Sequence, residues 1–428
     1  MKLFTKIKTC RISNDKNLIT VFNFGKLFLT GIFPKKKKKL KNRTPVEVVF
    51  SNKSKLLQLK HNYNEKKLFG DNYGYRSGLN QSMVYHLKKK SIILKKFINS
   101  SYNNKKNRFI LDIGSNDGTF LNFFSKEFKR IGLDPSANKF KQYYQKDIKI
   151  IPNILKENTF SNKFNEKFTL ISAIAMFYDL KEPKIFLKTL SRLLNNNGLI
   201  HIEIAYLPDI IRNNIFDTFC QEHLTYYSVH SFKYLLDQTD LIIQDFGTNS
   251  INGGSMWFNI IKINNSNFFS LTKKTKLKIN NQIKYEKKIG IDKIRTYYSF
   301  FNRIKKNITK IRNNLKKLKK RKKIIYGYGA STKGNVLLQT TNISSKIFNC
   351  ILDVNKEKFN TYTPGTNILI RDENYLMIKK PHYIFVLIWH FQETIAKKLN
   401  NFLRSGGKII IPFPKYRIIK NVKRFEKI

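Results

Sequence analysis

Residues 109–135 read FILDIGSNDGTFLNFFSKEFKRIGLDP, and this stretch decides the fold class of the chain. An apolar run reaches Gly114, polar residues lead to Gly118, and apolar residues at helical spacing follow. The pattern predicts a strand, a tight turn and a helix. Glycine lets the backbone approach a ligand closely, and a helix that starts here would aim its free N–H groups at the same space. We therefore expect a ligand site at this turn.

The ligand expected at this turn is an adenosine-type cofactor. Asp134 ends a second expected strand about twenty residues further on, where a carboxylate can accept hydrogen bonds from both ribose hydroxyls. The turn lacks the complete dinucleotide fingerprint, and its polar side chains suit the ammonium and carboxylate of S-adenosylmethionine (SAM). SAM is therefore preferred to NAD, and a glycine turn that binds nothing is the remaining alternative. The expected cofactor residues are Asp112, Gly114, Ser115, Asn116, Gly118 and Asp134.

Strands and helices alternate through residues 78–262, which we assign to one SAM-binding α/β domain with a Rossmann-like fold. An amphipathic helix is expected at 83–100. This alternation predicts parallel strands with right-handed crossovers and ligands at the carboxyl ends of the strands. The expected strands are 109–113, 130–134, 147–151, 168–174, 199–204 and 241–246.

The composition is strongly basic: 82 Lys plus Arg against 28 Asp plus Glu give a net charge of +54 over 428 residues. Such a charge suggests nucleic acid or an anionic membrane. However, the abundant Lys, Asn, Ile, Phe and Tyr are encoded by A/T-rich codons, and residues 193–232 are locally acidic. Three cysteines are too few for a disulfide framework, and no apolar run reaches the roughly twenty residues of a membrane span. We expect a soluble, cytoplasmic protein that binds neither membrane nor nucleic acid.

Residues 1–77 are expected to form a small, irregular N-terminal domain. Two C-x-x-C knuckles would make a tetrahedral zinc site here, but serine fills three of the four positions, and a hydroxyl is a poor zinc ligand. We expect no zinc at this degenerate site of Cys10, Ser13, Ser51 and Ser54. Near the end of the domain, Tyr73 and Tyr75 could pack or could reach a site with their hydroxyls, and packing is the favoured interpretation.

Residues 216–228, FDTFCQEHLTYYS, gather a carboxylate, an imidazole and two phenols. Histidine can accept a proton near neutral pH, and the adjacent carboxylate of Glu222 could orient His223 or stabilise its charge. A pair of surface residues at a helix start is an equally good interpretation. Cys220 has no neighbour that clearly lowers its pKa, so we interpret it as a small buried residue.

Residues 263–322 are rich in Lys and Asn and predict a basic helical connector. A second nucleotide-type unit, 323–428, opens with a strand and the turn 327–335, GYGASTKGN. Its backbone N–H groups could seat a diphosphate, with Gly329 in the turn and Lys333 as the cation. No acid/base cluster accompanies it, so it is not expected to be a second catalytic centre.

Several strings taken together resemble the SAM-dependent sugar C-methyltransferases that build branched deoxysugars. They are the knuckle domain, LDIGSNDGTFL, QEHLTYYS, NGGSMWF from Asn252, GYGASTKGN, and the closing WHF and PFP. The resemblance covers nearly the whole chain and implies three domains and a nucleotide-diphosphate-linked keto-deoxyhexose substrate, methylated next to the ketone. It implies His223 as base with Glu222 beside it and Tyr75 reaching in. Substrate contacts would come from Tyr73, Asn252, Gly329 and Lys333.

The chain departs from this family at three places. Most zinc ligands are lost, Cys220 stands where some members have a tyrosine, and a histidine after the fourth strand is replaced by 176–179, MFYD, so that Tyr178 could substitute for it. Two rival functions stay open: an RNA-binding protein or nucleic-acid methyltransferase, and an inactive relative. Against the first stands the absence of an N-P-P-[YF] string and of a paired-cysteine arrangement. The sequence does not give the oligomeric state.

Overall fold

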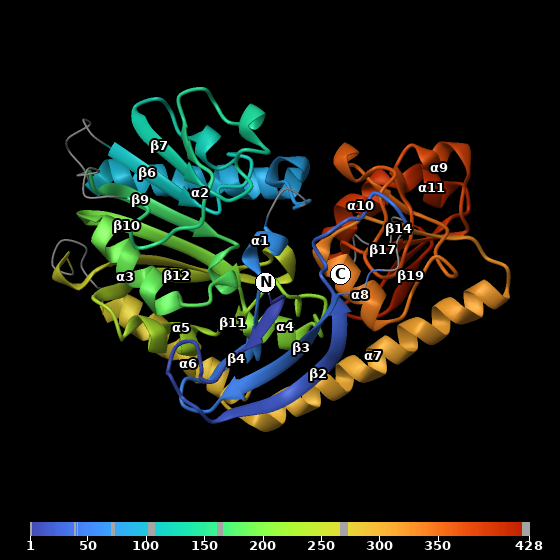
Figure 1. The fold of residues 1–428 in the computed structure, drawn as a ribbon, viewed down its shortest axis with the longest axis horizontal. Helices are drawn as coiled ribbons and strands as arrows, with labels where there is room; N and C mark the ends of the chain where they lie inside the picture. Colours follow the sequence, from blue (N-terminus) through green and yellow to red (C-terminus); the bar gives the residue numbers. More distant parts are fainter. Residues whose placement is uncertain are drawn as a thin grey trace.

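The computed structural model describes residues 2–37, 40, 42–69, 73–101, 108–160, 166–265 and 273–421. In these residues the strands form sheets of seven, six, four and two strands. Figure 1 shows the seven-stranded sheet in one lobe and the six-stranded sheet in the other, with the four-stranded sheet at the base between them. The two nucleotide-type units and the N-terminal part of the chain therefore meet in the middle of the molecule.

The seven-stranded sheet confirms the predicted α/β fold class. Its order is β12-β13-β10-β9-β6-β7-β8, so the connections reverse direction between β6 and β9, and the carboxyl ends of these two strands flank a crevice. Five adjacent strands of this sheet, β10, β9, β6, β7 and β8, run parallel to one another. The bounds are β6 Arg108–Ile113, β7 Phe128–Leu133, β8 Lys149–Ile151, β9 Phe168–Ile174, β10 Leu194–Ala205, β12 Leu241–Asn249 and β13 Ser255–Lys262.

Strand β13 is absent from the sequence prediction, and it runs antiparallel to both of its neighbours, β10 and β12. Gly253 and Gly254, with φ of +92° and +130°, close the hairpin that leads from β12 into β13. Helices cover the faces of the sheet: α2 Gln81–Ser101, α3 Pro183–Leu193 and α5 Val229–Leu236. Helix α2 matches the amphipathic helix expected at 83–100 and buries Leu87, Leu94 and Ile98 in the same cluster as the sheet residue Ile110.

The α-helix predicted after Gly118 is wrong. The segment contains only a 3₁₀ turn, η2 Leu121–Phe123, whose backbone closes i→i+3 hydrogen bonds from Phe123 and Phe124. The apolar spacing that suggested a helix is real, because Phe120, Phe124 and Phe128 are all buried in one cluster. A tight 3₁₀ turn is enough to bury these rings before β7 begins, so no helix dipole points at the turn.

The N-terminal part is a regular antiparallel sheet and not the irregular domain that we predicted. It contains β2 Leu18–Phe28, β3 Arg43–Ser51 and β4 Leu56–Leu59, and β11 Thr225–Tyr226 adds to the edge of β4. A short pair, β1 Phe4–Lys6 and β5 His61–Tyr63, lies beside it. Alternate residues of β3, from Val46 to Phe50, are fully buried, as expected for a strand with one face on a core. Strand β11 belongs to the segment that carries Glu222 and His223, so this sheet holds that segment in place.

The C-terminal lobe is the predicted second Rossmann-like unit. Its sheet has the order β16-β15-β14-β17-β18-β19, parallel except for β19. Helix α8 Thr332–Thr340 follows β14 directly, and smaller helices follow later: α9 Tyr375–Ile378, α10 Gln392–Lys398 and α11 Asn400–Arg404. The strand bounds are β14 Ile325–Tyr328, β15 Ile351–Asp353, β16 Ile370–Asp372, β17 Tyr383–Val386, β18 Lys408–Ile411 and β19 Arg417–Ile419.

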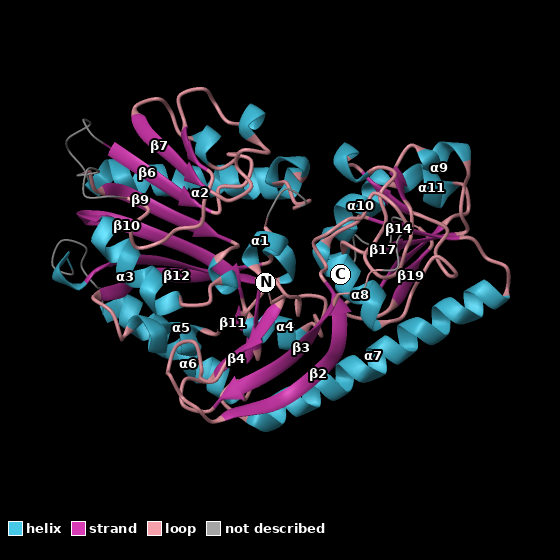
Figure 2. Cartoon of the chain, viewed as in Figure 1, coloured by secondary structure: helices cyan, strands magenta, loops and turns pink. Residues whose placement is uncertain are grey.

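Two lysine-rich helices, α6 Lys273–Lys288 and α7 Ile294–Lys320, connect the lobes, and residues 266–272 of the predicted connector lie outside the described residues. Figure 2 shows α7 running beneath the N-terminal strands toward the C-terminal lobe. One hydrophobic cluster joins the N-terminal sheet, residues 207–226, α7 and the C-terminal sheet. Within the described ranges, no helix is both long and apolar enough to cross a membrane.

Candidate functional site

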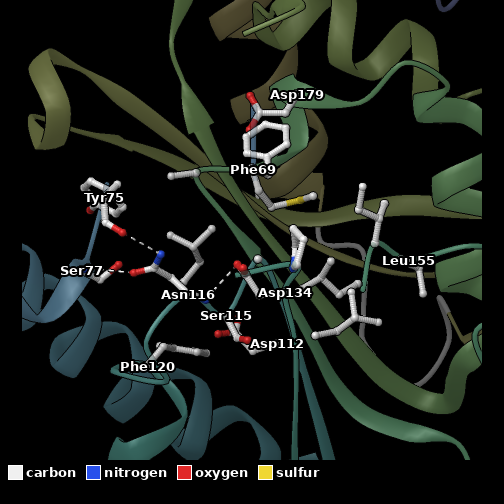
Figure 3. A pocket seen from close by; sticks show the side chains of 18 of the residues that line it. Phe69, Tyr75, Ser77, Asp112, Ser115, Asn116, Phe120, Asp134, Leu155 and Asp179 are labelled. Atoms are coloured by element: carbon white, nitrogen blue, oxygen red, sulfur yellow. Dashed lines mark hydrogen bonds between the residues drawn. The ribbon is translucent and has the colours of Figure 1, made fainter. Parts of the chain in front are cut away.

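A cavity of about 170 Å³ opens where β6, β7 and β9 end, at the crevice that the strand order creates. Figure 3 shows Asp112, Ser115, Asn116 and Asp134 on one side of it. Apolar residues, among them Leu133, Ile154 and Leu155, line the part beyond Asp134, and residues from the N-terminal part, including Phe69, Tyr73 and Tyr75, close the other side. A carboxylate beside an apolar slot suits an adenosine ribose and its base.

The glycines of the turn fit tightly against side chains. Gly114 and Gly118 both have φ of +74°, the left-handed region that favours glycine. A Cβ at Gly114 would come within 2.9 Å of Met176, and one at Gly118 within 2.6 Å of the ring of Tyr144. Gly114 lines the cavity and Gly118 does not. Gly118 thus makes room for Tyr144, whose hydroxyl bonds Ser115 Oγ at 2.8 Å and the carbonyl of Asn116 at 2.9 Å.

Asp112 and Asp134 are the two predicted cofactor carboxylates, and both are buried. Burial raises the pKa of Asp112 to about 7, although Ser172 Oγ donates a hydrogen bond of 2.6 Å to it. Burial also raises the pKa of Asp134. Asp134 Oδ1 accepts from the N–H and hydroxyl of Ser136, whereas Oδ2 accepts only the Asn116 N–H, at 3.0 Å. Oδ2 keeps acceptor capacity for a ribose hydroxyl, so the described residues fit the nucleoside part of SAM.

The polar side chains of the turn bind the chain that carries Tyr75. Asn116 Nδ2 donates to the carbonyl of Tyr75 at 3.1 Å, and Asn116 Oδ1 accepts the Ser77 N–H at 2.9 Å. Asp117 Oδ2 accepts the Gly78 N–H at 2.9 Å. Asn116 lines the cavity, but these bonds occupy its amide, so its predicted cofactor contact stays a prediction.

Tyr73 and Tyr75 both line the cavity. The sequence analysis favoured a packing role for them over a position at a site. Tyr75 is 43% exposed, which is high for a large aromatic side chain that lies inside the molecule. All three parts of the chain touch this segment. Lys139 Nζ donates to the carbonyl of Tyr73 at 2.9 Å and Asn355 Nδ2 to that of Gly74 at 3.3 Å. The tyrosines are thus held by the SAM-domain turn on one side and the C-terminal lobe on the other.

The geometry of His223 assigns its tautomer. His223 Nδ1 lies 2.9 Å from the carbonyl of Thr218, and because a carbonyl only accepts, Nδ1 carries the proton and Nε2 has a free lone pair. The ring of Tyr178 meets the imidazole edge-on, with centroids 4.5 Å apart. Burial, followed by the charge of Lys333, lowers the pKa of His223 to about 3, so the ring is neutral at neutral pH. Neither His223 nor Tyr178 lines the cofactor cavity itself.

Glu222 does not touch His223 through a hydrogen bond but faces the N-terminal sheet and the C-terminal lobe. Thr30 Oγ1 donates to Glu222 Oε2 at 3.2 Å, and a Cβ on Gly31 would come within 2.6 Å of Oε1. The same Cβ on Gly31 would lie 3.6 Å from Thr332 Oγ1 on α8. Burial raises the pKa of Glu222. The equally favoured interpretation of Glu222 as a surface residue is therefore wrong, because its side chain is 4% exposed.

Asp179 is a site residue that the sequence interpretation missed. Its carboxyl lines the cavity, and Figure 3 shows it above the ring of Phe69. Oδ1 is buried and has no hydrogen-bond partner among the described residues. Burial, and then the charge of Glu222, raise the pKa of Asp179 well above its usual value. Its position directly after Tyr178 in MFYD was the available signal.

Of the predicted substrate residues of the C-terminal lobe, Lys333 is close enough for its charge to act on His223. Lys333 Nζ donates to the carbonyl of Asn252 at 3.4 Å, and its charge acts on His223, Asp217 and His390. The backbone of the turn is less available than predicted. Ala330 N–H is bound to Asp353 Oδ2 at 2.6 Å and the N–H of Gly329 to the carbonyl of Leu352 at 2.8 Å. Lys333 is therefore the main group that this turn can offer an anion.

The four knuckle positions converge in space as a zinc site would. Cys10 Sγ lies 3.2 Å from Ser54 Oγ, and Ser13 Oγ lies 3.4 Å from Ser51 Oγ. Ser51 in turn donates to Asp15 Oδ2 at 2.9 Å. One thiol and three hydroxyls do not fit zinc, and the described part of the chain contains no group of three or more His, Cys, Asp or Glu that could hold a metal ion.

Comparisons with known proteins agree with this architecture. Two family models match: a methyltransferase domain over residues 89–244 and a C-methyltransferase C-terminal domain over residues 250–414. The C-methyltransferase NovU of Streptomyces niveus is 25% identical over 423 residues, which cover 96% of this chain and 97% of NovU. A tRNA U34 carboxymethyltransferase of Campylobacter lari is 30% identical over 116 residues, 24% of this chain and 38% of that protein.

Among solved structures, a SAM-dependent methyltransferase from Clostridium acetobutylicum has a TM-score of 0.32 and 19% identity, over 42% of this chain and 92% of that one. The two family models follow one another along the chain, and NovU matches it almost from end to end. These matches are the evidence for the kind of protein that this chain is. The cavity with Asp112 and Asp134 supplies the expected SAM site in the first of these domains. The chain is therefore a SAM-dependent methyltransferase that carries a methyltransferase domain followed by a C-methyltransferase C-terminal domain.

Proposed function

We propose that this enzyme methylates the carbon next to the ketone of a nucleotide-diphosphate-linked keto-deoxyhexose. The observation that carries the proposal is the position of His223: its Nε2 lone pair has no partner among the described residues, Tyr178 contacts its ring, and, after burial, the charge of Lys333 acts on it. A base beside a cation, at the junction of the SAM domain and the C-terminal lobe, suits a carbon acid that bears a diphosphate. The substrate class is the one implied by the family that the sequence resembles.

In this proposal His223 Nε2 accepts the proton on the carbon next to the ketone, and the electron pair moves to the ketone oxygen. Bound SAM supplies an electrophilic methyl group. The enolate carbon forms the new C–C bond as the S–CH₃ bond breaks, which leaves a neutral thioether, and His223 later releases its proton to water. Tyr75 and Tyr178 would orient the sugar, and the bond from Asn116 to Tyr75 and the contact of Tyr178 with His223 support this role.

Lys333 has a second effect in this proposal. Its charge lowers the pKa of His223, and an anion bound at Lys333 would offset that charge. Binding of the diphosphate would therefore make His223 a stronger base at the moment when the sugar is in place. The same geometry makes His223 a poor base in the free enzyme, which protects against unproductive protonation.

The decisive experiment is incubation of the enzyme with SAM and a panel of nucleotide-linked ketosugars in D₂O. We expect deuterium at the carbon next to the ketone, and methyl transfer to the same carbon. His223→Ala should abolish both and leave SAM affinity nearly unchanged. Retained turnover in this variant would remove His223 as the base, and the absence of exchange with every sugar would exclude the substrate class.

A further inference from the structure

Asp179 and Tyr178 are neighbours on one 3₁₀ turn, η4 Phe177–Asp179, and their side chains serve two sides of one space. Asp179 lines the cofactor cavity, whereas the ring of Tyr178 contacts His223. One short turn thus contributes to both the cofactor cavity and the surroundings of His223. The carboxyl of Asp179 is the group to explain, because Oδ1 is buried without a hydrogen-bond partner among the described residues.

Among the described residues, no cation is recorded as acting on Asp179. The groups that interact with it electrostatically are Glu222, Cys220 and the phenols of Tyr73, Tyr178 and Tyr226. Lys181 also lines the cavity, but its ammonium pairs with Glu65 at 3.0 Å. An ionised carboxylate with neither cation nor donor would be strongly disfavoured here.

The charge of Glu222 acts on Asp179, and two interacting carboxyl groups in an apolar interior disfavour ionisation of both. Of the two, Glu222 has the better means of carrying the charge, because Thr30 Oγ1 donates to its Oε2. The pKa of Asp179 is raised by burial and then by Glu222, in agreement with a proton on Asp179. A neutral carboxylic acid has an O–H to donate, and among the described residues no acceptor is bound to it.

We propose that Asp179, as the neutral acid, donates a hydrogen bond to the ketone oxygen of the substrate and holds the enolate that forms there. This inference rests on the proposed function. The O–H···O bond strengthens as charge gathers on the oxygen and weakens again when the carbon attacks the methyl group, and Asp179 keeps its proton throughout. The position of Asp179 on the cavity wall is the observation that supports this role.

Two substitutions of Asp179 separate this role from a simple charge. Asp179→Asn keeps the size and a donor N–H but cannot ionise, so we expect it to retain roughly a third or more of the wild-type kcat. Asp179→Ala removes the donor and should lower kcat by about 10²–10³-fold, the loss seen for a missing oxyanion donor. SAM affinity and Tm should change little in both. Asp237→Asn, an exposed carboxylate paired with Lys233, is the matched control and should behave as wild type.

A second measurement does not need the substrate. The infrared band of a protonated carboxylic acid at pH 7 should lose intensity in Asp179→Asn and persist in Glu222→Gln. Loss in Glu222→Gln alone would place the proton on Glu222 and overturn the inference. If the wild type methylates the sugar and Asp179→Asn is inactive, the inference about Asp179 is overturned as well, whereas the proposed function stays intact. If no ketosugar exchanges deuterium, the proposed function fails and the role at an enolate falls with it, whatever the infrared result.

Discussion

Asn116 in the SAM turn holds Tyr75 of the N-terminal part, through a bond of 3.1 Å from its amide to the Tyr75 carbonyl. The same amide accepts the Ser77 N–H at 2.9 Å. Asn116, two residues after Gly114, therefore fixes a tyrosine that comes from another part of the chain and lines the same cavity. If Asn116 also contacts the cofactor as predicted, cofactor binding and the placement of Tyr75 are coupled through one side chain.

Removal of this amide should lower turnover more than it weakens SAM binding. Asn116 has φ of +51°, so Asn116→Gly removes the side-chain bonds without adding backbone strain. We expect kcat to fall by roughly ten-fold or more, because a misplaced orienting group costs rate steeply. SAM affinity, measured by calorimetry, should change by only a few-fold. Asn122→Gly removes an exposed amide that bonds the carbonyl of Tyr143, and it should leave kcat unchanged. Equal losses of kcat and SAM affinity would contradict the positioning role.

SAM affinity should rise with pH near neutrality. Burial raises the pKa of Asp112 to about 7, so about half of this carboxyl is protonated at pH 7 in the free protein. If Asp112 faces the ammonium of SAM, binding favours the ionised form and releases a proton. We expect affinity to increase several-fold from about pH 6 to about pH 8. Calorimetry in two buffers of different ionisation heat would measure the proton released, and Asp112→Asn should abolish it.

The same carboxyl affects the stability of the free protein in the opposite sense. Its folded pKa lies above its unfolded value, so its contribution to stability is complete below about pH 4 and is lost as pH rises through about 7. The Tm of Asp112→Asn should therefore depend less on pH over that interval than the Tm of the wild type. If the Tm of the wild type and the Tm of Asp112→Asn change by the same amount from pH 4 to 7, Asp112 is not the group responsible.

Lys333 should affect the substrate and not the cofactor. A charge-assisted hydrogen bond is worth about 1.5–3 kcal/mol, so Lys333→Met should raise KM for the nucleotide sugar by about ten- to a hundred-fold. Lys333→Arg keeps the charge and should lose much less. Lys346→Met removes an exposed lysine of the same lobe and serves as control. An unchanged KM in Lys333→Met would place the diphosphate elsewhere.

The local sequence pattern predicted what depends on local chemistry. Strand β9 has the predicted bounds 168–174, and the glycine turn and the acidic end of β7 lie at one cavity. The helix after Gly118 failed because buried Phe120 and Phe124 show the spacing of a helix whether the backbone is α or 3₁₀. What no local pattern could give is contact across the chain.

The environment of Glu222 illustrates this limit. Its partner Thr30 follows β2, about two hundred residues away in the sequence, and the space at Gly31 beside its Oε1 is also bordered by Thr332 of α8. Burial at this place raises the pKa of Glu222. Asp179 was overlooked for the same reason: its position after Tyr178 was the available signal, but only the structure shows that its buried Oδ1 has no hydrogen-bond partner among the described residues. The cross-chain bond from Asn116 to Tyr75 likewise depends on where the N-terminal segment lies.

The degenerate knuckle gives the last prediction. Its four positions pair at 3.2 and 3.4 Å, so the backbone holds them where a tetrahedral metal would need them, while hydroxyls replace the thiolates. Metal analysis of the purified protein should find less than one zinc per chain, and EDTA should leave its Tm unchanged. Ser13→Cys, Ser51→Cys and Ser54→Cys combined should bind one zinc and raise Tm in its presence, because metal bound only to the folded form stabilises it. Stoichiometric zinc in the unmodified protein would show instead that these hydroxyls, with Asp15, suffice as ligands.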